Sequence, residues 1–335
     1  MKAVFFEQHG DVDVLQYGDF PDPEVQPGWV TVKVHACSLN YLDIFSRRGM
    51  PGIRIALPNI TGGDCVGAIA ELGVGVTGWL VGQRVLIDPV LWDPQTGRPS
   101  MLGETCKGAM AEYCTVHQSQ LMALPDDISD EDASCLPVAY GTSHRMIITR
   151  GRVKAGEKVF ILGASGGVGT SSLLIAKMQG AYVIAAAGSD EKCARLKELG
   201  ADETINYSTT NFQEYCKNTT GTLFTGGGYD VVINFTGGGT WAPSLRCVKL
   251  GGRLLTCGAT AGFDPPTDIR YIWTGELNIM GSNGWRREDL FALVELVRQK
   301  KLKPVIDKVM PLSEGIEACR LLEDRRFFGK IVVKP

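Results

Sequence analysis

The stretch VFILGASGGVGTSS, residues 159–172, constrains the fold of this chain more than any other feature. An apolar run typical of a buried strand comes first. Gly163, Gly166 and Gly169 follow at three-residue intervals and lead into a pattern typical of a helix. Small residues let the backbone approach a pyrophosphate, and the following helix offers free N–H groups to the anion. In this setting the glycines predict a dinucleotide-binding turn. The alternative is an ordinary strand-to-helix turn that needs glycines for its geometry alone.

Strands and helices alternate after this turn. A helix is expected at 189–200, and apolar strands are expected to end near residues 207, 237, 259 and 282. This alternation predicts a parallel sheet covered by helices on both faces. Residues 1–124 instead contain short apolar runs separated by Gly and Pro, which predicts a β-rich region. A helix is expected over 129–147, with Ser129 as its N-cap.

Length and composition exclude several classes of protein. The chain has 335 residues, enough for two domains. Its net charge of −3 leaves no basic excess, so a nucleic-acid partner is not expected. There is no apolar run of about 18 residues and no basic, apolar leader, so neither a membrane span nor a signal peptide is expected. The ten cysteines are scattered without a C-x-x-C pair, which favours reduced thiols in a cytoplasmic protein.

The end of the second strand of the sheet favours one nicotinamide cofactor over the other. NAD-binding folds usually place an acidic residue there, on the ribose 2′-hydroxyl. Here no acid precedes Asp190, and Lys192 lies in the first helical turn, where the helix dipole disfavours a cation. A 2′-phosphate held by Ser189, Lys192 and Tyr207 would explain that lysine, so NADPH is expected rather than NADH. The alternative is a solvated helix start in which Asp190 and Glu191 offset Lys192.

Six segments together resemble the medium-chain dehydrogenase/reductase superfamily over nearly the whole chain. They are ACSLNYLDIFSRRG (36–49), GGDCVGAIAELGVGVTGWLVGQRV (62–85), LGETCKGAMAEYCTV (102–116), ILGASGGVGTSSLLIAK (161–177), AGSDEKCARLKELGADETINY (187–207) and FFGKIVVKP (327–335).

The resemblance implies an α/β fold with two domains. A GroES-like, β-rich catalytic domain would comprise residues 1–124 and 285–335. A doubly wound, parallel-sheet dinucleotide-binding domain of the Rossmann type would comprise residues 125–284. The resemblance also implies a small-molecule substrate and a homodimer or homotetramer, with strand pairing between subunits expected within residues 263–282.

The resemblance also completes the expected cofactor site. Loops 234–238, 257–262 and 281–285 leave strands at their C-terminal ends, where ligands bind in open α/β sheets. Together with the turn and the second strand, the expected cofactor contacts are Ala164, Ser165, Gly166, Gly167, Val168, Ser189, Lys192, Tyr207, Phe235, Thr236, Gly258, Ala259 and Asn283.

Most zinc ligands of the superfamily's alcohol dehydrogenases are missing from this chain. The resemblance assigns them to an early cysteine, a Gly-His-Glu, and a cysteine or carboxylate near the first helix of the coenzyme domain. Cys37 matches the first position, Gly63 replaces the histidine while Asp64 stands at the acidic position, and Val138 falls at the third. A catalytic zinc needs three protein ligands, so no zinc is expected and Cys37 is interpreted as a small buried residue. A four-cysteine structural zinc lobe is not expected either, because residues 90–106 contain only Cys106.

The superfamily's zinc-free branches include quinone oxidoreductases and enoyl reductases, and SLNYLD resembles their active-site segment. Asn40 would orient the substrate or the cofactor ribose, Tyr41 would donate a hydrogen bond or a proton to the carbonyl oxygen, and Asp43 and Arg47 would act behind them. In the alternative, Asn40 caps a turn and Asp43 pairs with Arg47 at helical i,i+4 spacing.

These residues predict a zinc-independent, NADPH-dependent reductase of quinones or α,β-unsaturated carbonyl compounds. Such acceptors are already electrophilic and need positioning and a hydrogen-bond donor rather than a Lewis acid. Two other functions stay open. One is an NAD(P)-dependent alcohol dehydrogenase or aldehyde reductase, and the other is a catalytically idle NADPH-binding protein.

Overall fold

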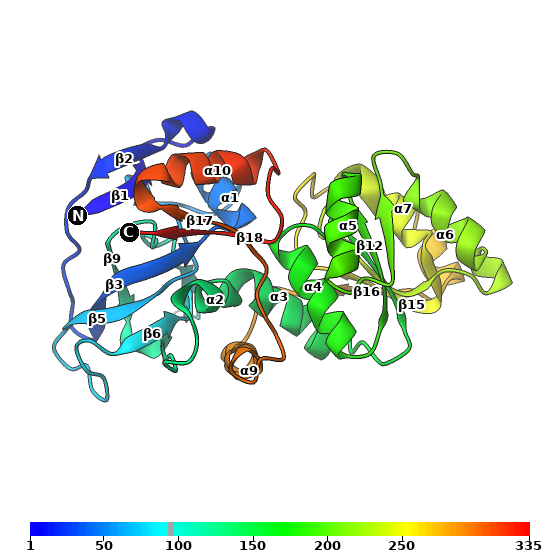
Figure 1. Ribbon diagram of the computed structural model, residues 1–335. Coiled ribbons are helices and arrows are strands. Elements are labelled where there is room, and N and C mark those ends of the chain that lie inside the picture. The colour runs from blue at the N-terminus through cyan, green and yellow to red at the C-terminus, as the bar shows by residue number, and fades with distance from the viewer. Residues whose placement is uncertain (93–96) are drawn as a thin grey trace. The chain divides into compact units, whose positions relative to one another are not determined.

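A computed structural model describes residues 1–92 and 97–335 (Figure 1). The chain forms two compact units. Unit 1 comprises residues 1–139 and 290–335, and unit 2 comprises residues 140–289. Both expected classes are present, since unit 1 is β-rich and unit 2 contains a parallel sheet.

Unit 1 is built around the long strand β3, in which valines alternate with polar residues. Val30, Val32 and Val34 are buried while Lys33 is exposed, as expected for a strand with one covered face. β3 pairs with β5, β9 and β18, and the extended sheet has the order β10-β6-β5-β3-β18-β17. A three-stranded sheet, β2-β1-β4, and the hairpin β7-β8 complete the strands. Their bounds are β1 (Lys2–Phe6), β2 (Gln16–Asp19), β3 (Trp29–Ser38), β4 (Asn59–Ile60), β5 (Val66–Leu72), β6 (Arg84–Ile87), β7 (Val90–Trp92), β8 (Pro99–Met101), β9 (Tyr113–His117), β10 (Leu121–Ala123), β17 (Ile306–Pro311) and β18 (Lys330–Lys334).

Two helices of unit 1 pack on each other although they lie at opposite ends of the chain. They are α1 (Tyr41–Arg48) and α10 (Gly315–Glu323). The buried guanidinium of Arg47 on α1 donates a hydrogen bond to Glu323 Oε2 at 2.6 Å and another to the carbonyl of Gly10 at 3.1 Å. This ion pair attaches the C-terminal segment to the N-terminal one.

The units divide at 139/140 and 289/290, later in the chain than the expected 124/125 and 284/285. The first shift has a visible cause. Helix α2 (Asp130–Ser134) packs on β3 and β5, and Asp130 accepts a hydrogen bond from Arg84 at 2.6 Å. Near the second division, α9 (Arg287–Arg298) contributes most of its length to unit 1.

The helix expected over 129–147 begins as predicted but is not continuous. Ser129 is the N-cap, and its hydroxyl accepts a hydrogen bond from the backbone N–H of Asp132 at 3.1 Å. After α2 the backbone passes through π-helical turns on either side of α3 (Gly141–His144). Pro137 has no N–H to donate, so a regular α-helical hydrogen-bond pattern cannot run through this position.

Unit 2 is a six-stranded parallel sheet with the order β13-β12-β11-β14-β15-β16. From β11 the chain adds β12 and then β13 on one side. It then crosses back and adds β14, β15 and β16 on the other side. Right-handed crossovers therefore place α4 and α5 on one face of the sheet and α6 and α7 on the other (Figure 1). This is the doubly wound arrangement that the alternating pattern predicts. The bounds are β11 (Lys158–Leu162), α4 (Gly167–Met178), β12 (Tyr182–Ala187), α5 (Asp190–Glu198), β13 (Glu203–Asn206), α6 (Phe212–Thr220), β14 (Tyr229–Ile233), α7 (Trp241–Leu245), β15 (Val248–Thr256), α8 (Arg270–Thr274) and β16 (Asn278–Gly281).

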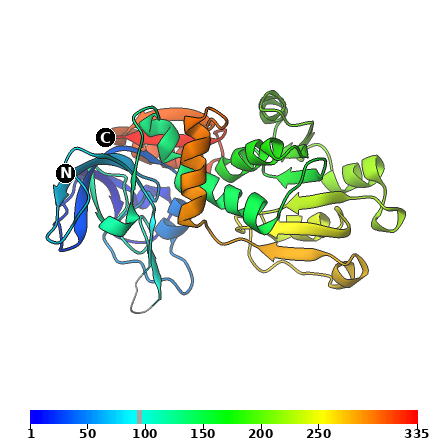
Figure 2. The ribbon, with the colours of Figure 1, turned by 90° about the horizontal axis from the view of Figure 1, so that it is seen from below.

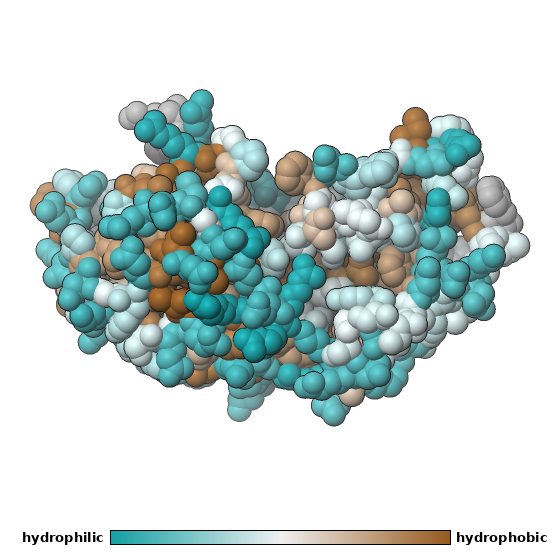
Figure 3. Space-filling view, turned by 90° about the horizontal axis from the view of Figure 1, so that it is seen from above, coloured by the Kyte–Doolittle hydropathy of each residue, from teal (hydrophilic) through white to brown (hydrophobic). Residues whose placement is uncertain are grey.

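Each unit has its own hydrophobic core. In unit 2 the ring of Phe160 stacks between Phe212 and Tyr229, with both centroid distances at 5.4 Å. On the face shown in Figure 3, hydrophobic residues form scattered patches among hydrophilic ones. In the part of the chain that the structure describes, no helix is long and apolar enough to cross a membrane.

Candidate functional site

The glycine-rich turn has the strand-turn-helix form expected from the sequence. Gly163 follows β11 with a φ of +73°, a left-handed conformation that favours glycine. Gly166 is the N-cap of α4, so the free N–H groups of this helix lie directly after the turn. A Cβ on Gly169 would lie 2.5 Å from Cα of Ala164, so only glycine allows this close approach of helix and turn.

One further predicted loop lies against this turn, and a second is bonded to that loop. A Cβ on Gly163 would meet the ring of Phe235 at 3.4 Å and the hydroxyl of Thr236 at 3.6 Å. The loop after β14 is in turn tied to the loop after β15, because the backbone N–H of Ala261 donates to the carbonyl of Thr236 at 2.7 Å. The structure thus brings together the predicted contacts from three neighbouring strands, β11, β14 and β15.

The predicted 2′-phosphate residues lie near the ends of β12 and β13. A Cβ on Gly188 would lie 3.0 Å from the hydroxyl of Tyr207, so these two segments touch. Ser189 is the N-cap of α5, and its hydroxyl accepts a hydrogen bond from the backbone N–H of Lys192 at 3.3 Å. Asp190 accepts a hydrogen bond from the amide of Asn206 at 2.7 Å, so its carboxylate is engaged beside the lysine.

Asn283, the last predicted cofactor contact, is exposed after β16, and its neighbour Ser282 donates a backbone hydrogen bond to Thr256 at the end of β15. The C-terminal ends of parallel strands meet at one edge of a sheet, which is where open α/β sheets bind ligands. All predicted cofactor residues therefore belong to one edge of unit 2.

Unit 1 contains a buried polar cluster centred on Asp64. Its Oδ2 accepts hydrogen bonds from Ser38 Oγ at 2.7 Å, from Asn40 Nδ2 at 2.8 Å and from Lys330 Nζ at 3.1 Å. Its Oδ1 accepts one from the backbone N–H of Val138 at 2.8 Å. The side chains of Asp64 and Lys330 are 0% and 2% exposed, so this ion pair is shielded from water.

Asp43, the third predicted catalytic residue, is a buried carboxylate held by backbone groups. It accepts hydrogen bonds from the N–H of Asn40 at 2.7 Å and of Gly62 at 2.9 Å. Burial raises the pKa of Asp43 to about 6, although these two N–H groups oppose the shift. Arg47 donates to Glu323 instead, so the alternative pairing of Asp43 with Arg47 is wrong.

The other two predicted catalytic residues stand at the start of α1. Asn40 occupies the N-cap position of this helix, its side chain bonds to Asp64, Ser38 and Lys330, and it is 7% exposed. Tyr41 is half-buried, and its ring packs edge-on against Phe45 at a centroid distance of 5.3 Å. Asn40 is thus enclosed by unit 1, whereas Tyr41 retains contact with solvent.

The sequence interpretation missed Lys330 and Ser38. One signal for Lys330 was available, because a lysine that opens the apolar strand KIVVK is unusual in a buried element. Ser38 carried no such signal, since serine occurs in every kind of structure.

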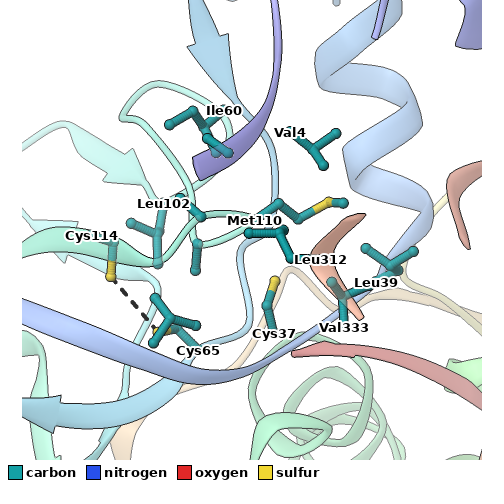
Figure 4. Packing of buried hydrophobic residues seen from close by; sticks show 14 of the residues in the cluster. Val4, Cys37, Leu39, Ile60, Cys65, Leu102, Met110, Cys114, Leu312 and Val333 are labelled. Atoms are coloured by element: carbon teal, nitrogen blue, oxygen red, sulfur yellow. Dashed lines mark hydrogen bonds between the residues drawn. The ribbon is translucent and has the colours of Figure 1, made fainter. Parts of the chain in front are cut away.

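The three positions that superfamily zinc ligands would occupy belong to the same part of unit 1. A Cβ on Gly63 would lie 3.6 Å from Val138 Cγ2, and a Cβ on neighbouring Gly62 would lie 2.7 Å from Cys37 Sγ. Cys37 points into an apolar cluster with Met110 (Figure 4), and burial raises the pKa of its thiol well above the usual value.

These residues do not fit a zinc ion. A zinc ligand must be a thiolate, an imidazole or a carboxylate, whereas Gly63 has no side chain and Val138 has an aliphatic one. Among the residues that the structure describes, no group of three or more His, Cys, Asp or Glu could hold a metal ion. Part of segment 90–106, for which no structural zinc lobe is expected, lies outside those residues.

Comparison with known proteins assigns the chain to a family. Residues 26–126 match the alcohol dehydrogenase GroES-like domain, and residues 167–299 match the zinc-binding dehydrogenase family. The chain is 34% identical to quinone oxidoreductase-like protein 2 of Mus musculus, over 92% of this chain and 85% of that protein.

Two solved structures show the same fold. An NAD-dependent alcohol dehydrogenase superposes with a TM-score of 0.91 at 34% identity, covering 100% of both chains. The 2-octenoyl-CoA carboxylase reductase CinF, in complex with NADP and 2-octenoyl-CoA, superposes with a TM-score of 0.88 at 27% identity, covering 99% of this chain and 87% of that one. The chain therefore belongs to the medium-chain dehydrogenase/reductase superfamily of NAD(P)-dependent oxidoreductases.

Proposed function

We propose that this protein is a zinc-independent, NADPH-dependent reductase of quinones or α,β-unsaturated carbonyl compounds. The observation that carries this proposal is the set of side chains at the superfamily's zinc position. Gly63 and Val138 have no donor atom there, and the Asp64 carboxylate is already paired with Lys330, which leaves Cys37. An alcohol needs a Lewis acid to become an alkoxide before it loses hydride. A quinone or an enone is electrophilic without one.

The surroundings of Gly63 support an apolar acceptor. A Cβ at this position would meet the carbonyl oxygen of Leu102 at 3.2 Å, and Met101 Cε and Val138 Cγ2 each at 3.6 Å, so the side chains around it are apolar. A neutral Cys37 thiol with a raised pKa adds no charge there. This part of unit 1 therefore suits the hydrocarbon portion of a quinone or enone better than a hydrated metal ion.

Tyr41 is the residue we assign to proton donation. Reduction adds a hydride and a proton to the acceptor, and bound NADPH supplies the hydride. A phenol can stabilise the developing oxyanion by a hydrogen bond and then transfer its proton, which it regains from water. Both amide hydrogens of Asn40 are used inside unit 1, so we assign Asn40 and Asp43 to holding the segment before Tyr41.

NADPH is proposed as the cofactor because of residues at the ends of β12 and β13. Ser189 caps the helix whose first turn contains Lys192, Gly188 contacts Tyr207, and Asp190 is engaged by Asn206. The likeness to CinF, solved with NADP, supports the same choice.

We also propose that the protein forms a homodimer or homotetramer through β16, and that it resides in the cytoplasm. β16 is one of the two edge strands of the parallel sheet (Figure 2), the other being β13. An unpaired edge exposes backbone N–H and C=O groups, and here Ile279 is 38% exposed beside them. Light scattering of the purified protein measures the assembly directly.

The test of the reaction is NADPH oxidation, with a chelator present, against quinones, enones and aldehydes. Turnover of quinones or enones that the chelator leaves unchanged supports the proposal. The likeness to an NAD-dependent alcohol dehydrogenase makes alcohol oxidation the second candidate. Alcohol or aldehyde activity that appears only with zinc would establish that candidate. Tight NADPH binding without turnover of any acceptor would mean a catalytically idle protein.

A further inference from the structure

Lys330 is a buried lysine of unit 1, and the reaction proposed above assigns it no role. Lys330 opens β18 and is 2% exposed, which is rare for a lysine unless its charge is paired. Its ammonium donates to the carbonyl of Leu39 at 2.7 Å, to Asn40 Oδ1 at 2.6 Å and to Asp64 Oδ2 at 3.1 Å. An ammonium has three hydrogens, so every one has an acceptor.

These contacts leave Asn40 only one favourable side-chain orientation. Its Oδ1 faces the Lys330 ammonium, and its Nδ2 donates to Asp64 at 2.8 Å and to the carbonyl of Ser38 at 3.3 Å. A rotated amide would turn its NH₂ group toward the ammonium and its oxygen toward the carboxylate. Both contacts would then repel in a buried setting where charges are weakly screened.

The contacts also hold the main chain directly before Tyr41. Lys330 binds the carbonyl of Leu39, and Asp43 binds the N–H of Asn40. The cluster thus fixes both the backbone and the side chain of the residue that precedes Tyr41.

We propose that Lys330 is a positioning residue whose ammonium group fixes the Asn40 amide and the Leu39 carbonyl, and thereby the placement of Tyr41. The kinetic part of this inference rests on the proposed function, whereas the orientation of Asn40 does not. The charged and titratable groups that face the ammonium are Asp64, Asp43, Cys37 and Cys135.

The first experiment compares the native protein with Lys330→Met and with the double variant Lys330→Met/Asp64→Asn. Methionine keeps the unbranched shape but leaves the Asp64 charge buried without a partner, which destabilises the fold. The double variant removes both charges, so no charge is left buried without a partner. Lys334→Met is the matched control, because Lys334 lies on the same strand but is 41% exposed and pairs with Glu131.

Thermal unfolding and steady-state kinetics are measured on all four proteins. Because a small misplacement of a reacting group can reduce rate about 100-fold, we expect kcat of the double variant to stay about 10- to 100-fold low. Its KM and NADPH affinity should stay close to native values. A purely structural Lys330 predicts that kcat recovers together with stability, and that result would overturn the inference. The double variant keeps this test decisive even if Lys330→Met does not fold.

A second readout does not depend on turnover. In protein labelled with ¹⁵N-asparagine, the Asn40 side-chain amide is assigned by its loss in Asn40→Ala. Its two hydrogens should exchange slowly in the native protein and at least about tenfold faster in the double variant, because the amide is then free to rotate. Unchanged exchange would refute the positioning role. If native protein turns over no quinone or enone, the proposed function fails while this measurement still decides the role of Lys330.

Discussion

Substituting alanine for two glycines of the turn should separate its folding role from its binding role. A Cβ on Gly169 would lie 2.5 Å from Cα of Ala164, whereas Cβ contacts in proteins essentially never fall below 3.0 Å. Helix α4 and the turn must therefore separate by at least 0.5 Å. A Cβ on Gly166 meets nothing within 4 Å, and its φ is −85°. The free protein should tolerate Gly166→Ala.

The expected costs follow from these two distances. Overpacking a tight site costs about 1–3 kcal/mol. For a unit of 150 residues each kcal/mol lowers Tm by about 2–4 °C, so Gly169→Ala should melt clearly earlier than the native protein. Gly166→Ala should melt like the native protein. Its methyl group, however, stands where the backbone would approach the pyrophosphate, so NADPH affinity should fall at least about tenfold.

Circular dichroism gives Tm, and fluorescence titration gives the dissociation constant of NADPH for each variant. Native melting of Gly169→Ala would show that the close approach of helix and turn does not constrain the fold. Native NADPH affinity of Gly166→Ala would show that this turn does not hold the phosphates, and the assignment of the cofactor site would be wrong.

Three further predictions concern single side chains. Lys192→Glu should lower kcat/KM for NADPH at least about tenfold relative to that for NADH. The reason is that the proposed hydrogen bond from Lys192 to the 2′-phosphate is charge-assisted, and such a bond contributes about 1.5–3 kcal/mol. Steady-state kinetics with both cofactors checks this prediction. Tyr41→Phe should lower kcat at least about 100-fold with little change in KM, as expected on loss of a proton donor. Asp43→Asn should abolish a pH dependence of stability. Burial raises the pKa of Asp43 from 3.8 to about 6, so the folded protein binds this proton more tightly than the unfolded chain. Its contribution should therefore fall by about 3 kcal/mol as pH rises from about 4 to 6, and then stay constant.

Each of these predictions has a clear contrary result. An unchanged cofactor preference in Lys192→Glu would place the 2′-phosphate elsewhere or favour NADH. Full activity of Tyr41→Phe would mean that water or another group supplies the proton. For Asp43, urea unfolding of native and Asp43→Asn proteins is compared between pH 4 and 7. A difference in unfolding free energy that does not vary with pH would show that Asp43 does not titrate in this range.

The sequence predicted the features that depend on neighbouring residues. The glycine-rich turn, the alternation of strands and helices in unit 2, and Ser129 as an N-cap all follow from local spacing, and the structure has each of them. The helix expected over 129–147 is present as helical backbone interrupted by a turn at Cys135, but π-helical turns replace the regular α-helix around Pro137. The predicted cofactor residues stay untested as contacts, but they lie on one edge of one sheet.

Residues far apart in sequence account for what the sequence did not predict. Lys330 is hydrogen-bonded to Asn40, 290 positions away in the sequence, and to Asp64, 266 positions away. No local sequence pattern predicts such long-range contacts. The same holds for Gly63 and Val138, whose proximity defines the surroundings of the superfamily's zinc position. Sequence periodicity determined which segments become strands and helices, because backbone geometry repeats locally. Only the tertiary structure decided which buried charges became partners, because that choice depends on how β3, β5 and β18 bring distant side chains together away from water.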